Sequence, residues 1–272
     1  MADALDRLTS SEMQRFSVCP VRCARVSSRV ESVADYFSVI AAAVKEDQIF
    51  WFRGHAKAEW SLTPWALRPP QERERASALS LISHFKRIAE IKIDRPPAPD
   101  EELMWAQIAQ HYGLPTRLLD WTESAATALF FACLKTNEDG MVFILNPVDL
   151  NKLTFPRKPR VLDPRTDAES ISKYLGLSGR RSARGRYPIA VNPVWNSQRL
   201  MLQKGVSTVH GARFDLDTGR IPSLVAIPIL SESKARLRAE LERVGIDEMT
   251  IFPELEHACT HLTRKAGLLP WG

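Results

Sequence analysis

The spacing of apolar residues changes along this chain, and that change constrains the fold more than any other feature of the sequence. In the N-terminal half, apolar residues recur at helical spacing and predict helices over residues 30–46, 73–93, 101–112 and 123–135. Short apolar runs predict strands over residues 48–52, 141–145, 189–191, 199–202, 206–209, 224–229 and 249–252. Because helices and strands do not alternate regularly, we expect an α+β fold, with a helix-rich half packed on a mixed or antiparallel sheet.

Length and composition suit one folded domain. The chain has 272 residues, of which 44% are hydrophobic, enough for a sizeable core. Residues 1–28 are polar and irregular, so we expect an N-terminal arm followed by a single domain over 29–272. The N-terminus lacks a basic segment followed by an apolar run, and the longest apolar run, 125–134, is too short to span a membrane. We therefore expect a cytoplasmic protein without membrane contact.

The excess positive charge is concentrated in one segment. Residues 157–186 contain nine Lys or Arg and three Asp or Glu, an excess of six, whereas the net charge of the whole chain is +5. This segment lies within a turn-rich, basic insertion that we expect over 150–187. Such a patch attracts nucleic acid, nucleotide phosphates or an acidic partner. A solvated insertion without a partner is the alternative interpretation.

The cysteines do not indicate a disulfide framework or a metal centre. A chain of this length with four cysteines has no need of disulfides, and Cys19 and Cys23 lack the usual zinc-ligand spacing. His257, Cys259 and His261 have a metal-binding composition, but residues two apart on a helix point in different directions. We therefore predict no metal site.

The first polar cluster lies in the stretch FWFRGH, residues 50–55. Arg53 follows a strongly apolar strand, and Gly54 lets the backbone turn and approach another group closely. An arginine held by a strand is a suitable binding group for a phosphate or a carboxylate. The alternative is a structural arginine satisfied by an internal acid, for which Asp120 is the natural partner.

The second polar cluster directly precedes an apolar helix. His111 ends one predicted helix, and Thr116, Arg117 and Asp120 are expected on the loop that leads to the next helix, which Thr122 caps. Loops of this kind project polar groups into clefts, and the positive end of the following helix favours an anion beside Arg117. Alternatively, Arg117 and Asp120 tie the loop down and His111 is a satisfied histidine at the edge of the core.

Five tryptophans flank these clusters. If exposed, they could stack on nucleobases beside arginine side chains. Because tryptophan is usually mostly buried, we expect most of them to belong to the core. They are Trp51, Trp60, Trp65, Trp105 and Trp121.

Several of these stretches together resemble the FRG domain family, which is named for an aromatic-Arg-Gly motif. The motif appears here as Phe52-Arg53-Gly54 within FWFRGHAKAEWSLTPWALR, followed by SHFKR, AQHYGLPTRLLDWTESAATALFFA and RLMLQKGVSTVHG. The resemblance covers about residues 48–145 and returns weakly at 199–211 and at IFPELE. It implies a module of mostly bacterial proteins, some in phage-linked or defence settings, without an assigned activity.

A more distant resemblance is to ADP-ribosyltransferases. There a strand ending in aromatic-Arg-Gly, a polar segment leading into an Ala-rich helix and a Glu-bearing strand follow in this order. The resemblance implies that NAD is the cofactor, that Arg53 holds ribose or phosphate, and that a carboxylate stabilises an oxocarbenium-like ribose. Aligning RLMLQKG on the Glu-bearing strand places Arg199 at the glutamate position, with Gln198 beside it. Asp120 or Glu254 would have to supply the carboxylate.

These observations lead to one functional hypothesis and one alternative. We expect a cleft that binds a phosphate-bearing ligand, NAD or another nucleotide, with ADP-ribosyl transfer in a toxin or defence role as the hypothesised activity. The ligand-binding candidates are Arg53, Gly54, Thr116, Arg117 and Gln203, and the catalytic candidates are His111, Asp120 and Glu254. The alternative is a non-catalytic module that binds nucleic acid or protein through residues 157–186.

Overall fold

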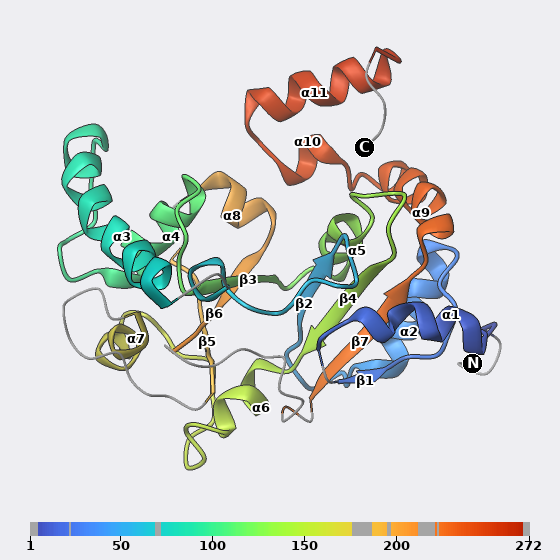
Figure 1. Cartoon of the computed structure of the whole chain (residues 1–272), viewed down its shortest axis with the longest axis horizontal. Helices are drawn as coiled ribbons and strands as arrows, with labels where there is room; N and C mark the ends of the chain where they lie inside the picture. The colour runs from blue at the N-terminus through green and yellow to red at the C-terminus, as the bar shows by residue number, and fades with distance from the viewer. Residues whose placement is uncertain are drawn as a thin grey trace.

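The computed structural model describes residues 5–21, 23–68, 72–175, 187–194, 197–211, 221 and 223–268, and for 72–80 only the backbone. In this part of the chain seven strands form one mixed sheet in the order β1-β7-β4-β2-β3-β6-β5 (Figure 1). The strands are β1 (Ala24–Arg25), β2 (Trp51–His55), β3 (Leu118–Thr122), β4 (Gly140–Leu145), β5 (Ile189–Val191), β6 (Gly205–Val209) and β7 (Leu224–Ile229). β1 runs parallel to β7 and the other pairs are antiparallel. The predicted α+β class is confirmed.

The sheet is buried on both faces at its centre. All six residues of β4 are buried, and their side chains alternate between two apolar clusters. Met141, Phe143 and Leu145 face one cluster, and Val142 and Ile144 face the other. A continuous apolar strand of this kind requires a cover on each side of the sheet.

Two groups of helices cover one face. At the β7–β4–β2 side lie α2 (Val33–Ala43), α5 (Ala125–Ala132) and α9 (Ser231–Arg243), which contribute to the same cluster as Phe52. At the β3–β6–β5 side lie α4 (Glu102–His111) and α7 (Ala168–Leu175), in a cluster with Leu118. Leu118 shares a strand face with Thr122, which is paired with Phe52, so both groups lie on the same face. Asp120 lies on this face between them.

The N-terminal segment covers part of the other face. It comprises α1 (Ser10–Arg15), the 3-10 turn η2 (Phe16–Val18) and the edge strand β1. Phe16 is fully buried and Val21 nearly so, and both lie in the core cluster on this face, together with Leu150 of α6 (Pro147–Lys152). Residues 5–21 and 23–28, expected as part of an arm, therefore pack on the domain.

Two predicted strands are helices. Residues 199–202 lie in α8 (Gln198–Leu202) and residues 249–252 largely in α10 (Glu248–Ile251), which precedes α11 (Leu255–Lys265). Each short helix begins at a side-chain cap: Ser197 accepts the N–H of Leu200, and Asp247 accepts the N–H of Thr250. Short apolar runs do not distinguish strand from helix by spacing alone, and here the caps decide the local conformation.

The segment expected as a polar loop before α5 contains a strand. Residues 118–122 form β3, which pairs with β6 along its whole length. The predicted cap is also shifted, because the N-cap of α5 is Ser124, which accepts the backbone N–H of Thr127, whereas the Thr122 hydroxyl accepts the N–H of Ser124. Asp120 is consequently fixed by a strand, whereas the sequence predicted a loop.

The long helix α3 (Glu72–Lys92) and the turn η3 (Trp65–Leu67) complete the architecture. Within the predicted basic insertion, α7 lies at 168–175, and residues 176–186 fall outside the described part of the chain. In the described ranges, no helix has the length and apolarity needed to cross a membrane.

Candidate functional site

The candidate site begins where two neighbouring strands separate. β2 pairs with β4 along all five of its residues, but it pairs with β3 at one position only, Phe52 opposite Thr122. Beyond this position β2 and β3 diverge (Figure 1). The Arg53 side chain bridges the opening, because its Nη1 donates a hydrogen bond to the backbone carbonyl of Asp120.

Neutral acceptors hold the Arg53 guanidinium in place. Besides the carbonyl of Asp120, it bonds through Nε to His55 Nε2 at 3.0 Å. No carboxylate of a described residue lies within 4.0 Å of it. Burial lowers the pKa of Arg53 to about 10, against the opposing effect of the Asp120 charge. Arg53 is therefore a fixed cation at neutral pH that forms no ion pair with the described part of the chain.

His55 holds the Arg53 side chain in position from the same strand. It is buried, and its ring makes edge contacts with Phe143 and with Trp60. Burial, and then the charge of Arg53, keep the pKa of His55 well below its usual range. The imidazole is thus neutral, as Nε2 must be to accept from Arg53.

A hollow of about 310 Å³ opens beside Arg53. The two sides of the sheet opening contribute Arg53 and Asp120, and the loop after α5 contributes Lys135. Its remaining polar or aromatic lining includes the backbone of Gly54 together with Trp60, Arg199 and Gln203. A second hollow of about 140 Å³ shares Asp120, Arg199 and Gln203 with the first and extends to Gln110 and His111 of α4. We call the two hollows together the cleft.

Gly54 does not end β2 but lies inside it. A Cβ atom at this position would lie 1.9 Å from the backbone oxygen of Ala128 in α5. The predicted close approach therefore exists, and the group that approaches is a helix of the protein itself.

Asp120 is the carboxylate of the cleft. Its Oδ2 accepts a hydrogen bond from Gln110 Nε2 at 2.5 Å, and Gln110 Oε1 accepts one from the Thr116 hydroxyl. The side chain reaches solvent, yet the surrounding protein desolvates it enough to raise its pKa, which the charge of Arg53 opposes.

The structure brings together only some of the predicted residues. Arg53, Gly54, Asp120 and Gln203 line the larger hollow, and His111 lines the smaller one. Gln203 is held there by a bond from its Nε2 to the carbonyl of Ile251 at 3.1 Å.

Arg117, Thr116 and Glu254 do not line the cleft. Arg117 is buried, and its Nη1 donates to the carbonyl of Tyr174 in the last turn of α7 at 2.8 Å, where helix carbonyls lack partners. The structure therefore does not bring Arg117 to the cleft, and its expected role in binding a ligand stays a prediction. Thr116 lies buried behind Gln110. Glu254 faces Arg199 at 3.7 Å, so it acts on the cleft only through that arginine.

The sequence analysis gave no role to His55, Gln110 and Lys135 of the cleft, and it named Trp60 only among the tryptophans that flank the polar clusters. His55 had a readable signal, since it lies two positions from Arg53 on the same strand face. Trp60 is 43% exposed, unlike the buried Trp51, Trp105 and Trp121, which belong to the core as expected. Gln110 and Lys135 had no signal, because their positions depend on how α4 and α5 pack.

Residues 48–140 match the FRG domain family. The chain contains an FRG domain. The matched segment includes both sides of the sheet opening, with Arg53, Trp60, Asp120 and Lys135, whereas Arg199 and Gln203 of the cleft lie beyond the FRG domain. No curated protein and no solved structure matched the chain.

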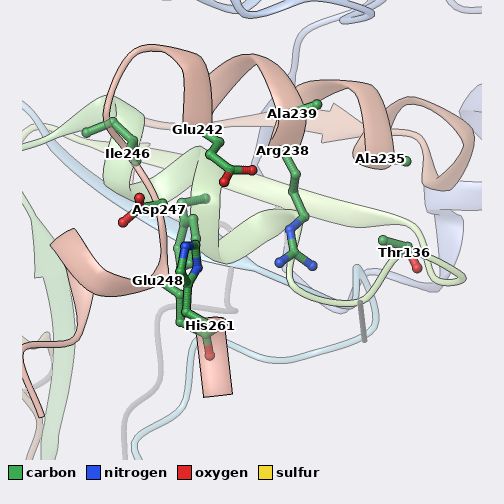
Figure 2. A pocket seen from close by; sticks show the side chains of 10 residues that line it. Thr136, Ala235, Arg238, Ala239, Glu242, Ile246, Asp247, Glu248 and His261 are labelled. Atoms are coloured by element: carbon green, nitrogen blue, oxygen red, sulfur yellow. The ribbon is translucent and has the colours of Figure 1, made fainter. Parts of the chain in front are cut away.

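A third hollow, of about 240 Å³, lies apart from the cleft, between α5, α9, α10 and α11. Arg238 and Glu242 project into it from α9, opposite Glu248 and His261 (Figure 2). Both signs of charge meet there, and none of the predicted site residues lines it. Among the described residues, no group of three His, Cys, Asp or Glu side chains could hold a metal ion.

Proposed function

We propose that the cleft binds a phosphate-bearing nucleotide and that Arg53 is its anion-binding group. The observation that carries this proposal is the state of Arg53, a fixed guanidinium bonded only to neutral acceptors and lining a hollow. Its Nη2 has no acceptor among the described residues. Desolvating an arginine without a carboxylate costs free energy, and a bound anion would recover part of that cost.

Neighbouring cations favour an anionic ligand. Lys135 and Arg199 line the same hollow, and Arg68 lies close enough to lower the pKa of both Arg53 and His55. Asp120 is the opposing charge in the hollow, and Glu254 partly offsets Arg199. The balance in the cleft is positive, which concentrates anions there.

An aromatic surface favours a nucleotide over a simple anion. The Trp60 ring is partly exposed, lines the hollow, and has Lys135 Nζ at 5.9 Å from its centroid. Nucleobases stack on such rings. The volume of about 310 Å³ is at the lower end of the range for small-molecule sites, so it suits part of a nucleotide such as NAD.

Calorimetric titration tests this proposal. We expect NAD or at least one of AMP, GMP, CMP and UMP to bind, and Arg53→Ala to weaken that binding at least tenfold. Arg53→Lys should recover little, since lysine cannot reproduce the planar set of donors. Arg157→Ala, an exposed arginine outside the cleft, is the matched control and should leave the affinity unchanged. Equal affinities for wild type and a folded Arg53→Ala would refute the proposal.

Asp120 favours a second candidate function, ADP-ribosyl transfer from NAD. In that reaction the bond between ribose and nicotinamide breaks, and nicotinamide leaves with the bonding electrons. An acceptor then bonds to the ribose carbon and loses a proton. Asp120 would stabilise the positive ribose and so take the role of the glutamate, whose position in the alignment is occupied here by Arg199. Arg199 lies on α8, whereas the glutamate of the transferases lies on a strand. Transfer to a macromolecule would suit a toxin or defence effector.

Release of free nicotinamide measures this second function. Wild type should release nicotinamide from NAD, and Asp120→Asn should abolish the release while keeping NAD affinity within a few-fold. Release that persists in Asp120→Asn would exclude this residue, and absence of release with every acceptor tried would leave nucleotide binding as the function.

The nucleic-acid alternative has its own test. In the described part of the basic segment, Arg160 is paired with Asp167 at 2.7 Å and Lys173 with Glu169 at 3.1 Å, so part of its charge is neutralised. The four arginines at 180, 181, 184 and 186 lie outside the described residues. Salt-sensitive nucleic-acid retention that survives Arg53→Ala but is lost when these four become Gln would favour the alternative.

A further inference from the structure

A directional chain of hydrogen bonds fixes the orientation of Asp120. The Thr116 hydroxyl oxygen accepts the backbone N–H of Leu118 at 3.2 Å and is also bonded to Gln110 Oε1. Because a carboxamide oxygen only accepts, the Thr116 proton points toward Gln110. The Gln110 amide is thereby oriented with Nε2 toward Asp120, where it donates to Oδ2.

This chain leaves one oxygen of Asp120 for a ligand. Among the described residues, no hydrogen bond or ion pair engages Oδ1, and Asp120 lines both hollows of the cleft. Since Oδ2 is held by Gln110, the carboxylate cannot rotate freely, and Oδ1 is a fixed acceptor. Thr116 is buried, so its bond to Gln110 is protected from competition by water.

A fixed donor lines the same hollow as this fixed acceptor. The Arg53 guanidinium is bonded to the backbone of Asp120 itself, and both residues line the larger hollow. A ligand that satisfies both must carry an anionic group for Arg53 and, a short distance away, a hydrogen-bond donor for Asp120 Oδ1. A second anionic group at that place would be repelled by the Asp120 carboxylate, which disfavours ligands with two adjacent anions.

We propose that the substrate class of the cleft is a ribonucleotide whose phosphate binds Arg53 and whose ribose hydroxyls donate to Asp120, with Thr116 and Gln110 as positioning residues. This inference rests on the nucleotide function proposed above. Ribose hydroxyls supply the required donors next to a phosphate, whereas a dicarboxylate carries no such donor and a 2′,3′-dideoxynucleotide has lost both hydroxyls.

Paired titrations test the inference. AMP, GMP, CMP and UMP are each compared with their 2′,3′-dideoxy counterparts. For every base that binds wild type, we expect the ribonucleotide to bind at least tenfold more tightly. Thr116→Val, which keeps the shape but loses the hydroxyl, should reduce this ratio to within about twofold of one, and Thr116→Ser should restore it.

The possible outcomes separate this inference from the proposed function. Equal affinities of wild type for ribo and dideoxy forms would overturn the inference and leave anion binding at Arg53 intact, whereas failure of every nucleotide to bind would overturn both. An unchanged ratio in Thr116→Val would exclude the positioning role. If that variant does not fold, Gln110→Met removes the amide that holds Asp120 while keeping the Thr116 side chain, and must lower the ratio in the same way.

Discussion

Arg53 and His55 depend on each other through one hydrogen bond. Arg53 donates through Nε, so His55 Nε2 must carry a lone pair, which requires a neutral ring. A protonated His55 would place a second buried cation against the guanidinium. The pair therefore holds the Arg53 side chain in position only while His55 stays neutral, and this links the geometry of the cleft to pH.

We predict that acid destabilises the protein through His55. The pKa of His55 in the folded protein is well below the usual value, so the fold favours the neutral ring. The contribution of neutral His55 to the free energy of unfolding is therefore full above about pH 6.5 and is lost as pH falls toward the folded pKa. The loss approaches about 1.4 kcal/mol per pH unit. His55→Gln keeps an acceptor for Arg53 but does not titrate, so urea unfolding between pH 5 and 7 should show a shallower slope. An unchanged slope would contradict the assignment.

The contact between β2 and α5 is the tightest element packing at the cleft. It exists because Gly54 has no side chain, which lets the Ala128 carbonyl lie over the strand. This contact places the start of the larger hollow against α5, and Lys135 lies on the loop that follows this helix.

We predict that Gly54→Ala destabilises the fold by about 3 kcal/mol, because the new methyl group collides with backbone atoms that cannot give way. Gly113→Ala is the comparison: its φ of 81° penalises a side chain, but nothing lies within 4 Å, so the cost should stay near 1 kcal/mol. Chemical denaturation measures both. Similar losses of stability for the two variants would show that the backbone conformation, and not the contact with α5, determines the cost of a side chain at position 54.

A buried lysine of α9 joins two loops beside the cleft. Lys234 Nζ donates to the carbonyls of Ala56 at 2.8 Å and Lys135 at 2.7 Å, and both residues line the larger hollow. Burial lowers the pKa of Lys234 to about 8. The α9 helix thus helps to shape the cleft without contacting it.

We predict that Lys234→Met lowers the free energy of unfolding by about 3 kcal/mol at pH 7, since two buried carbonyls lose their donor. In wild type, the lowered pKa of Lys234 makes its contribution to stability increase as pH rises from about 8 toward its unfolded value. The difference between variant and wild type should therefore grow over that range in urea unfolding. Arg243→Met, on the exposed side of the same helix, should change little, and an equal effect would refute the prediction.

At the scale of the whole molecule, the N-terminal segment belongs to the domain. β1 extends the sheet beside β7, and Arg15 bridges Asp139 and Glu232 on the loop before β4 and at the start of α9. Phe16 is fully buried in the core cluster on this face. These contacts couple the first residues of the chain to its C-terminal half.

We predict that Phe16→Ala costs about 4 kcal/mol and that the protein still unfolds in one transition, because the cavity forms in a shared core. Val18, two residues later, is 61% exposed, so Val18→Ala should stay within about 0.5 kcal/mol of wild type. Circular dichroism and tryptophan fluorescence should give coincident unfolding curves. If the segment were an independent arm, the two variants would behave alike.

The sequence by itself determined the fold class, the helices α2, α3, α4 and α5, the strands β2, β4, β5, β6 and β7, and the FRG motif. These follow from local regularities: apolar periodicity over long helices, β-branched runs such as 224–229, and a distinctive cluster around Arg53. It also identified Arg53, Gly54, Asp120 and Gln203, all of which line one hollow.

Only the tertiary structure decided which polar residues face that hollow. Arg117 and Asp120 are three residues apart, yet one bonds to a carbonyl at the end of α7 and the other lines the cleft. That division depends on β3 being a strand between β2 and β6 and on where β2 separates from it. Strand pairing and helix packing join residues far apart in the chain, and local spacing holds no information about such contacts.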